Sequence, residues 1–231
     1  MEQTRSTHPT VLTHIPPALR YPRGGEHREP VLKRPLDLGL AMLMLIISTP
    51  VSLLIAFAIR REDGGPVFYA QERWGRRGTR FHVLKFRTMI PDSDEKYGIR
   101  QAAHNDERIT RVGAILRKMG LDELPQLINI ARGEMSFVGP RALAIGEVIE
   151  DGKGNYIPYD QLPAFHERLA VRPGLTSLAT IFIPKDASPR RKFRYDLLYI
   201  RKQSIGLDLY LIALSFWISF RGKWETRGRK L

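Results

Sequence analysis

The fold is decided by residues 38–59, LGLAMLMLIISTPVSLLIAFAI, which contain 22 consecutive positions without a charged side chain. A helix of that length crosses a hydrocarbon core of about 30 Å. Pro50 stands near the middle, directly after Ser48 and Thr49, and a proline inside a helix removes one backbone hydrogen bond. The sequence therefore predicts a membrane-embedded helix over 31–61 that is broken at Pro50.

The charges on either side of this segment bear on how it sits in the membrane. The basic pairs Lys33–Arg34 and Arg60–Arg61 flank it. Because basic flanks favour the cytoplasmic side, both ends are predicted to stay there. A re-entrant helix that bends at the proline meets this condition, with a hydroxyl of Ser48 or Thr49 bonding the freed carbonyl. A kinked helix that crosses once is an equal alternative on these local features.

Composition narrows the classes of function. The 231 residues include no cysteine, which excludes a disulfide framework, a thiolate metal site and a thiol nucleophile. The net charge of +13 indicates polyanionic partners: nucleic acid, anionic lipid or phosphorylated substrates. The length suits one catalytic domain together with a membrane element.

The rest of the chain divides at the apolar segment. Residues 1–30 carry no sustained apolar pattern and are predicted to be flexible. Residues 62–231 show mixed helix and strand signals and predict one helix-rich α/β domain. Near the C-terminus, Leu209–Phe220 is apolar but too short to span a membrane, and a basic tail follows it. This combination predicts an amphipathic helix that lies on the membrane surface.

Local patterns inside the domain predict a hairpin followed by two helices. The β-rich runs 66–69 and 81–84 flank the glycine-punctuated segment 73–78, which is typical of a hairpin. Apolar residues at helical spacing then predict one helix that ends at Gly120 and a second that ends at Gly133.

Residues 121–141, LDELPQLINIARGEMSFVGPR, carry the strongest chemical signal. The adjacent carboxylates Asp122–Glu123 are predicted to lie at the N-terminus of the second helix, where such residues often act only as caps. Lys85 and Arg87 follow a β-like run and would share one face of a strand. Paired cations opposite two carboxylates predict a site for a metal-bound diphosphate, and Arg117 is close to it in sequence.

The order of these motifs resembles the bacterial sugar transferase family of polyprenyl-phosphate hexose-1-phosphate transferases, which are monotopic phosphoglycosyl transferases. The resemblance extends from Lys33 to about Phe220. The matching pieces are Lys33-Arg34 with Asp37, Pro50, Gly65-Pro66-Val-Phe, Gln71-Glu-Arg73, Lys85-Phe-Arg-Thr-Met89, Arg108-Ile-Thr-Arg-Val-Gly113, Leu121–Arg141 and Arg172-Pro-Gly174.

The resemblance implies a reaction and the residues that perform it. A sugar 1-phosphate would pass from a UDP-sugar to polyprenyl (undecaprenyl) phosphate, with release of UMP. Asp122 would be the nucleophile that carries a covalent phosphosugar, Glu123 would complete the catalytic dyad, and either carboxylate would hold Mg²⁺ together with substrate oxygens. The residues implied to bind phosphate or substrate are Lys85, Arg87, Arg117, Gly139, Pro140 and Arg141.

The resemblance also implies a location and partners. It favours the re-entrant helix, the bacterial inner (cytoplasmic) membrane and a catalytic domain of minimal length on the cytoplasmic face. The step would initiate glycoconjugate or exopolysaccharide synthesis. The phospholipid membrane would be a partner, whereas nucleic acid is not expected; the sequence leaves open whether the chain forms a homodimer. The residues implied to anchor the chain at the membrane, with the basic pair at lipid headgroups, are Lys33, Arg34, Asp37, Ser48, Thr49 and Pro50.

Three positions depart from the pattern of many relatives. Ala142 stands where a proline often follows the Gly-Pro-Arg motif, Ser177 where a glycine often closes the later motif, and Ala179–Thr180 near a common glutamine. None of them touches the predicted dyad. These departures mean that the preferred sugar cannot be carried over from the relatives, whereas the predicted reaction is unaffected.

Two other interpretations stay open at the level of sequence. In the first, Asp122 only positions the metal or acts as a base, and the lipid phosphate attacks the donor directly. In the second, the chain is a basic, membrane-tethered protein that binds nucleic acid or anionic lipid without catalysis, an interpretation that rests on charge alone.

Overall fold

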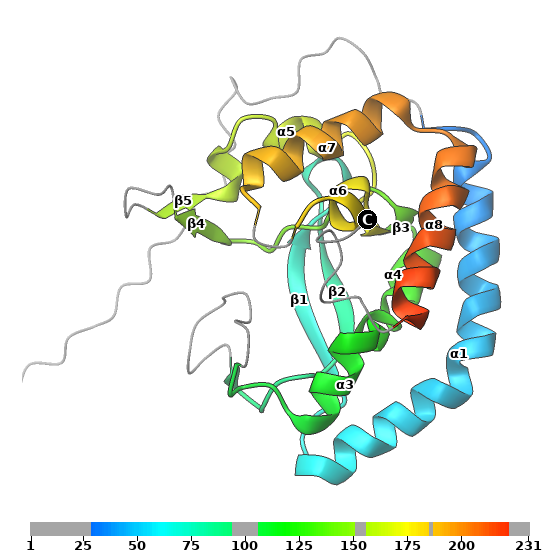
Figure 1. The fold of residues 1–231 in the computed structure, drawn as a ribbon, viewed down its shortest axis with the longest axis vertical. Helices are drawn as coiled ribbons and strands as arrows, with labels where there is room; N and C mark the ends of the chain where they lie inside the picture. Colours follow the sequence, from blue (N-terminus) through cyan, green and yellow to red (C-terminus); the bar gives the residue numbers. More distant parts are fainter. Residues whose placement is uncertain (1–28, 94–105, 151–155, 185–186, 222–231) are drawn as a thin grey trace, which may run out of the picture.

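The computed structural model describes residues 29–93, 106–150, 156–184 and 187–221, so the predictions for 1–28 and for the tail from 222 lie outside the described residues. The fold is mixed and helix-rich, as predicted (Figure 1). Its elements are α1 (Lys33–Asp63), β1 (Phe68–Trp74), η2 (Arg76–Gly78), β2 (Arg80–Phe86), α3 (Arg111–Met119), η3 (Leu121–Glu123), α4 (Gln126–Arg132), β3 (Ser136–Val138), β4 (Val148–Glu150), β5 (Tyr156–Pro158), η4 (Tyr159–Gln161), α5 (Phe165–Arg168), β6 (Gly174–Thr176), α6 (Leu178–Phe182), α7 (Pro189–Lys202) and α8 (Ile205–Phe220).

The predicted hairpin is formed by β1 and β2, which pair antiparallel from Phe68 opposite Phe86 to Trp74 opposite Arg80. Figure 1 shows this long ribbon running through the middle of the molecule. Two shorter pairs accompany it, a parallel one between β3 and β6 and an antiparallel one between β4 and β5. The sheets are thus small, and helices supply most of the packing around them.

Two glycines allow the Gly-Pro-Arg and Arg-Pro-Gly motifs to lie backbone against backbone. A Cβ at Gly139 would stand 2.3 Å from the carbonyl oxygen of Arg172. One at Gly174 would stand 2.1 Å from the backbone nitrogen of Gly139. Only glycine fits so close an approach without a shift of the backbone. These close contacts hold the motifs of Gly139 and Gly174 together beside the parallel pair β3–β6, and Arg141 follows after β3 has ended.

The main hydrophobic core lies where α1, α4 and α8 meet the short strands. Leu127 and Ile130 on α4, Phe137 on β3 and Leu211 on α8 are at most 3% exposed. Burying side chains of this size stabilises the fold by roughly 1.5–3 kcal/mol each. The first part of α1 contributes Ala41 to the same cluster, so the apolar helix is packed onto the domain at one end.

Taken as a whole, α1 is long and apolar enough to span a membrane. Ile46, Leu54 and Phe57 are about two-thirds exposed, which leaves a large apolar surface on this part of the helix. One helix is assigned across Pro50, and Figure 1 shows that α1 changes direction along its length. The chain therefore carries an apolar helix that packs on the domain at both ends, with Ile55 and Ile59 buried in the second half, and exposes apolar side chains between these contacts.

A hydroxyl bond precedes the proline, although its acceptor differs from the expected one. The Thr49 Oγ1 atom donates to the carbonyl oxygen of Leu45 at 2.7 Å. The proline ring of Pro50 deprives the following carbonyl, that of Ile46, of its usual donor. The Thr49 hydroxyl thus gives the Leu45 carbonyl a second donor, next to the Ile46 carbonyl that has lost its own. Such bonds from a side chain to the preceding turn commonly bend helices.

The Lys33 ammonium is buried inside the fold, which differs from the expectation that it lies at lipid headgroups. Lys33 Nζ lies 2.7 Å from Asp208 Oδ2 of α8 and 3.1 Å from the carbonyl oxygen of Val138. Both charged side chains are 2% exposed. The Tyr199 hydroxyl lies 2.7 Å from the other oxygen of Asp208. This cluster ties the start of α1 to α7, α8 and β3.

Arg34 and Asp37 also bond protein rather than remaining free for headgroups. The Arg34 guanidinium donates to the carbonyl oxygens of Ile130 and Ala131 at 2.6 and 2.8 Å, near the C-terminal end of α4. Asp37 Oδ1 accepts the Phe137 backbone N–H at 3.1 Å. The physical reason is the same in each case, because a helix end packed into a domain must pair its polar groups.

The C-terminal helix α8 is apolar on both faces, which corrects the prediction of an amphipathic pattern. Leu211 and Ile218 face the core, and Phe216, Trp217 and Phe220 are about half exposed or more. Its sixteen residues are too few to span a membrane, as predicted.

Candidate functional site

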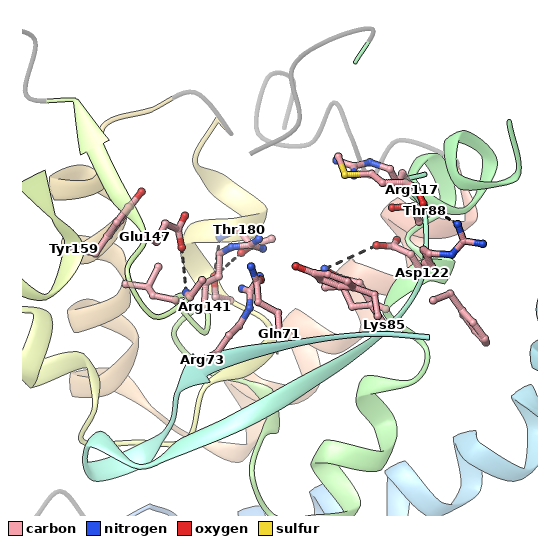
Figure 2. Close-up of a pocket in the computed structure, with 18 of the residues that line it drawn as sticks. Gln71, Arg73, Lys85, Thr88, Arg117, Asp122, Arg141, Glu147, Tyr159 and Thr180 are labelled. Atoms are coloured by element: carbon pink, nitrogen blue, oxygen red, sulfur yellow. Dashed lines mark hydrogen bonds and ion pairs between the residues drawn. The ribbon is translucent and has the colours of Figure 1, made fainter. Parts of the chain in front are cut away.

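A pocket of about 510 Å³ lies between the hairpin, η3, the segment after β3, and helices α6 and α7. Figure 2 shows two groups of polar side chains along it. Lys85, Asp122 and Arg117 lie at one end, and Arg141 and Tyr159 lie toward the other. A volume of this size suits a small-molecule ligand that is held at several polar points.

The predicted dyad lies in η3, one turn of 3₁₀ helix between α3 and α4, rather than in the first turn of an α-helix. Gly120 ends α3 in the left-handed conformation, with φ of 72°. Leu121–Glu123 then turns and leads through Pro125 into α4. The tight turn points both carboxylates at the pocket, and Asp122 is 9% exposed. Asp122 and Glu123 therefore do not cap an α-helix; their carboxylates line the pocket instead.

Lys85 on β2 is the cation that meets the dyad. Its Nζ atom lies 2.8 Å from Glu123 Oε1 and 3.8 Å from Asp122 Oδ2. The side chain is 18% exposed, so solvent screens these contacts only partly. The sequence correctly predicted that this cation would face the two carboxylates.

Arg87 lines the same pocket but its guanidinium is already engaged. It forms a two-pronged ion pair with the carboxylate of Asp63 at the end of α1. It also donates to the carbonyl oxygens of Pro66 at 2.6 Å and Met89 at 3.1 Å. Arg87 therefore ties the pocket wall to α1, and its contact with substrate stays a prediction.

The other predicted phosphate-binding residues fall into two groups. Arg117, on the last turn of α3, and Arg141 line the pocket. Arg141 is exposed, and its guanidinium has no hydrogen bond or ion pair with any residue that the structure describes. Gly139 and Pro140 are buried behind it and do not line this pocket. They place Arg141, so a direct contact with substrate would come from the arginine.

The structure adds pocket residues that sequence reasoning missed. Arg73 on β1 donates to the Gln71 side chain and to the Ala142 carbonyl oxygen. Burial and the nearby Arg141 lower the pKa of the Arg73 guanidinium to about 10. Burial raises the pKa of Tyr159 to about 12. Besides the predicted Arg141, the sequence signal for this end was the Gln71-Glu-Arg73 motif, to which the resemblance attached no role.

A buried ion pair supports the far wall of the pocket. Arg168 Nε lies 2.7 Å from Asp196 Oδ2, and both side chains are at most 3% exposed. The Arg168 guanidinium also donates to the Arg141 carbonyl oxygen at 2.9 Å. Burial raises the pKa of Asp196 above its ordinary value, and the charge of Arg168 opposes that rise. The pair fixes the backbone from which the Arg141 side chain extends.

The carboxyl of Asp122 does not have an ordinary acidity. Burial raises its pKa above 3.8, the charge of Lys85 lowers it, Glu123 raises it and Arg117 lowers it. Because the folded state holds the proton more tightly than the unfolded chain, ionising Asp122 costs stability as pH rises toward the folded pKa. An activity that needs the ionised carboxylate is lost as pH falls through that raised pKa.

We expect replacement of Lys85 by Met to move the acid limb of the pH–rate profile to higher pH. The substitution removes the strongest influence that lowers the Asp122 pKa, so the carboxylate protonates earlier as pH falls. Rates between pH 4 and 8 would be compared with those of Arg80→Met, an exposed cation on the same strand outside the pocket. An unchanged acid limb in the Lys85 variant would argue against this coupling.

The dyad fits a divalent cation that is completed by substrate. Among the described residues, no group of three or more His, Asp or Glu side chains is arranged to hold a metal ion by itself. Mg²⁺ commonly uses one or two carboxylates and takes its other ligands from phosphate and water. Asp122 and Glu123 are adjacent carboxylates that line the pocket, and this donor set is of that kind.

Comparisons with known proteins were made on the whole chain. The family model described as "Bacterial sugar transferase" matches residues 28–222. The exopolysaccharide production protein PSS of Rhizobium leguminosarum bv. phaseoli is 39% identical over 187 residues, which are 79% of this chain and 92% of that protein. ExoY of Rhizobium meliloti is 40% identical, over 78% of this chain and 81% of that protein. The UDP-glucose:undecaprenyl-phosphate glucose-1-phosphate transferase of Escherichia coli is 35% identical, over 90% of this chain and 44% of that protein.

Proposed function

Because this chain belongs to the bacterial sugar transferase family, we propose that it is a phosphoglycosyl transferase that moves a sugar 1-phosphate from a UDP-sugar onto undecaprenyl phosphate. The observation that carries the proposal is the Asp122–Glu123 dyad beside Lys85 in a large pocket. Relatives named as exopolysaccharide production proteins and as glucose-1-phosphate transferases support it. Four relatives are named for UDP-glucose, which makes UDP-glucose the first donor to test.

We propose a double displacement at Asp122. Its carboxylate oxygen attacks the sugar-linked β-phosphorus of the donor, and the bond from that phosphorus to the bridging oxygen breaks, so that UMP leaves with the electron pair. An oxygen of the lipid phosphate then attacks the same phosphorus and releases the carboxylate. We assign the binding of the phosphate oxygens to Lys85, which lies beside the dyad, and to Arg141, which lines the pocket.

The metal in this proposal is Mg²⁺, held by Asp122 and Glu123 with oxygens of the donor. When bound, it would neutralise diphosphate charge and stabilise the departing UMP. The chain's own contribution is a pair of carboxylates and a lysine in fixed positions. Glu123 is the better placed ligand during attack, because Asp122 must keep one oxygen for phosphorus.

We propose that α1 embeds the chain in the bacterial inner membrane as a re-entrant helix, with residues 62–231 on the cytoplasmic face. Support comes from the basic pairs at both ends and from the apolar surface that α1 exposes on both sides of Pro50. The exposed Phe216, Trp217 and Phe220 of α8 would contact the same membrane at its surface.

A labelling experiment tests the re-entrant topology, since the chain has no cysteine of its own. Single cysteines at Val31 and Arg61, both exposed and at opposite ends of α1, would react with an impermeant maleimide from the same side of oriented membranes. A cysteine at Leu54 is the control that the membrane should shield. Labelling of the two ends from opposite sides would establish a single crossing instead.

The experiment that tests the function measures UMP release by the whole chain in nanodiscs. UDP-glucose, other UDP-sugars and Mg²⁺ would be supplied with and without undecaprenyl phosphate. We expect sustained UMP release and a sugar-phosphate lipid product only when the lipid phosphate is present. If folded protein releases no UMP with any of the donors, the proposal is overturned. The alternative of a basic binder without catalysis has no support beyond net charge.

A further inference from the structure

Asn129 is a buried polar residue that the proposed reaction does not use. It lies on α4, on the helix that the dyad turn leads into, and is 0% exposed. Its side-chain oxygen accepts the Leu84 backbone N–H at 3.0 Å, and its amide nitrogen donates to the His82 carbonyl oxygen at 2.8 Å. These groups belong to β2, so one side chain bonds a strand from a neighbouring helix.

The two bonds replace the partner that the outer edge of β2 lacks. The strand pairs with β1 on one edge only, and its other edge would leave N–H and carbonyl groups buried without a partner. The amide of Asn129 offers an acceptor and a donor on the same side, as the backbone of one residue in a neighbouring strand would. It therefore docks β2 onto α4 at a fixed register as well as at a fixed distance.

A third contact sets the orientation of this amide. The Asn129 amide nitrogen also donates to Glu134 Oε2 at 2.7 Å, just after the end of α4. A carboxylate accepts and does not donate, so the nitrogen must face Glu134 and the oxygen must face Leu84. The amide is thus held in the one orientation that suits β2.

The contact between Asn129 and β2, called the joint below, bears on both Lys85 and the two carboxylates of the dyad. Lys85 follows Leu84 on β2, and its Nζ atom lies 2.8 Å from Glu123. The dyad precedes α4, the helix that carries Asn129. Figure 2 shows Lys85 rising from the hairpin toward Asp122, which comes from the other side of the pocket. A slip between β2 and α4 would change the distance between this cation and the carboxylates.

We propose that Asn129 is a positioning residue, which holds Lys85 at the dyad by docking β2 onto α4. The inference rests on the proposed function, since it concerns the same reaction. A displaced catalytic group commonly costs about 10- to 100-fold in rate. We therefore expect Asn129→Ala to lower kcat by about that factor, because the Leu84 N–H and the His82 carbonyl lose their partner.

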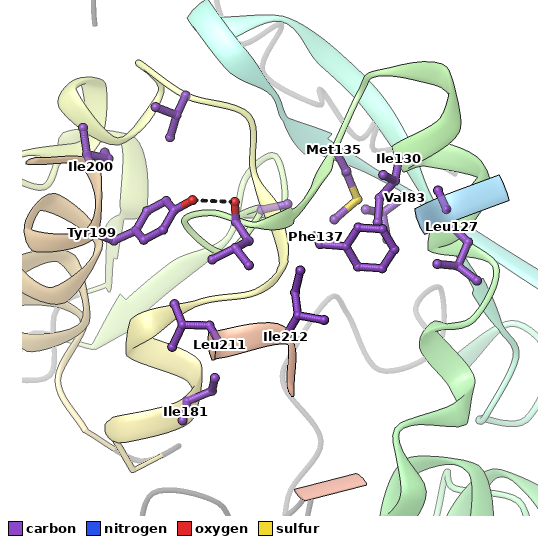
Figure 3. Packing of buried hydrophobic residues seen from close by; sticks show 14 of the residues in the cluster. Val83, Leu127, Ile130, Met135, Phe137, Ile181, Tyr199, Ile200, Leu211 and Ile212 are labelled. Carbon is purple, nitrogen blue, oxygen red and sulfur yellow. Dashed lines mark hydrogen bonds between the residues drawn. The ribbon is translucent and has the colours of Figure 1, made fainter. Parts of the chain in front are cut away.

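A double-mutant cycle separates positioning from loss of stability. In a Lys85→Met background the lysine that Asn129 would position is absent. Adding Asn129→Ala to that variant should therefore lower kcat by less than about twofold. Tyr199→Phe is the matched control, because it removes a buried hydroxyl that contacts Asp208 in the same protein. Figure 3 shows Tyr199 on the opposite side of the core from Val83 and Ile130, away from the joint. Its effect should multiply with that of Lys85→Met.

Two further measurements test the role of Asn129, and the first of them does not depend on knowing the donor sugar. Amide hydrogen exchange at Leu84 should accelerate in Asn129→Ala and stay unchanged in Tyr199→Phe. Asn129→Asp should be worse than Asn129→Ala, since it sets a carboxylate against Glu134, and adding Glu134→Gln should restore part of the activity.

The outcomes distinguish this inference from the proposed function. If the wild-type chain yields no lipid product, the proposed function fails, whatever the variants do. If the wild type is active but Asn129→Ala matches Tyr199→Phe, or multiplies fully with Lys85→Met, the positioning role is overturned. Unchanged exchange at Leu84 in Asn129→Ala would overturn it as well.

Discussion

Replacement of Asp122 by Asn is expected to abolish sugar-phosphate transfer, with a fall in rate of about 10⁴-fold or more. Asparagine has nearly the same shape, but its amide oxygen is a poor nucleophile and a weaker metal ligand than a carboxylate. The loss would therefore report chemistry rather than folding. Lipid product and UMP would be measured together, and the isotope from a β-³²P-labelled donor would be sought on the protein.

Asp160→Asn is the matched control for this prediction. Asp160 is an exposed carboxylate on η4 and does not line the pocket. It should retain wild-type activity. Wild-type protein that carries no label, together with kinetics that require both substrates at once, would instead support direct attack by the lipid phosphate. Label that persists in Asp122→Asn would place the nucleophile elsewhere.

Replacement of Lys33 by Met is expected to cost the largest amount of stability, about 3–5 kcal/mol. The substitution leaves the Asp208 carboxylate buried without its cation, since both side chains are 2% exposed. For a chain of this length, that cost corresponds to a fall of roughly 10 °C in Tm. Thermal unfolding in nanodiscs would measure it.

The partner substitution shows whether the effect comes from the unpaired charge. Lys33→Met with Asp208→Leu removes both charges and should recover most of the lost Tm, because an apolar pair of similar volume often replaces a buried ion pair at little cost. Arg61→Met, an exposed cation at the other end of α1, should change Tm by less than about 2 °C. A Tm in Lys33→Met equal to that of the wild type would mean that the pair contributes nothing.

The apolar helix α1 is joined to the pocket wall at its far end. At the far end, the Glu62 carboxylate accepts the Arg111 backbone N–H at 2.8 Å at the start of α3, the helix that carries Arg117. The neighbouring Asp63 grips Arg87 in the pocket wall. The position of α1 in a bilayer therefore bears directly on residues that line the site.

The sequence by itself determined the local elements and drew attention to the adjacent carboxylates Asp122 and Glu123, which line the pocket; their catalytic role stays a prediction. An apolar run of 22 residues specifies a membrane-seeking helix, because only burial in lipid or protein satisfies it. Alternating residues around a glycine-rich turn specified the hairpin, and Gly120 and Gly133 marked where α3 and α4 end. These features follow from neighbouring residues alone, so pattern reasoning reaches them.

Only the tertiary structure decided what the buried charges do. Lys33 has the appearance of a headgroup-binding lysine, yet its partner Asp208 lies 175 positions away along the chain. Arg87 has the appearance of a phosphate ligand, yet Asp63 occupies its guanidinium. Asn129 lies inside the motif of residues 121–141, yet nothing in that motif indicated that its side chain would bond β2. Pairing between distant segments depends on how the elements pack, and a buried polar group accepts whichever partner the packing brings within reach.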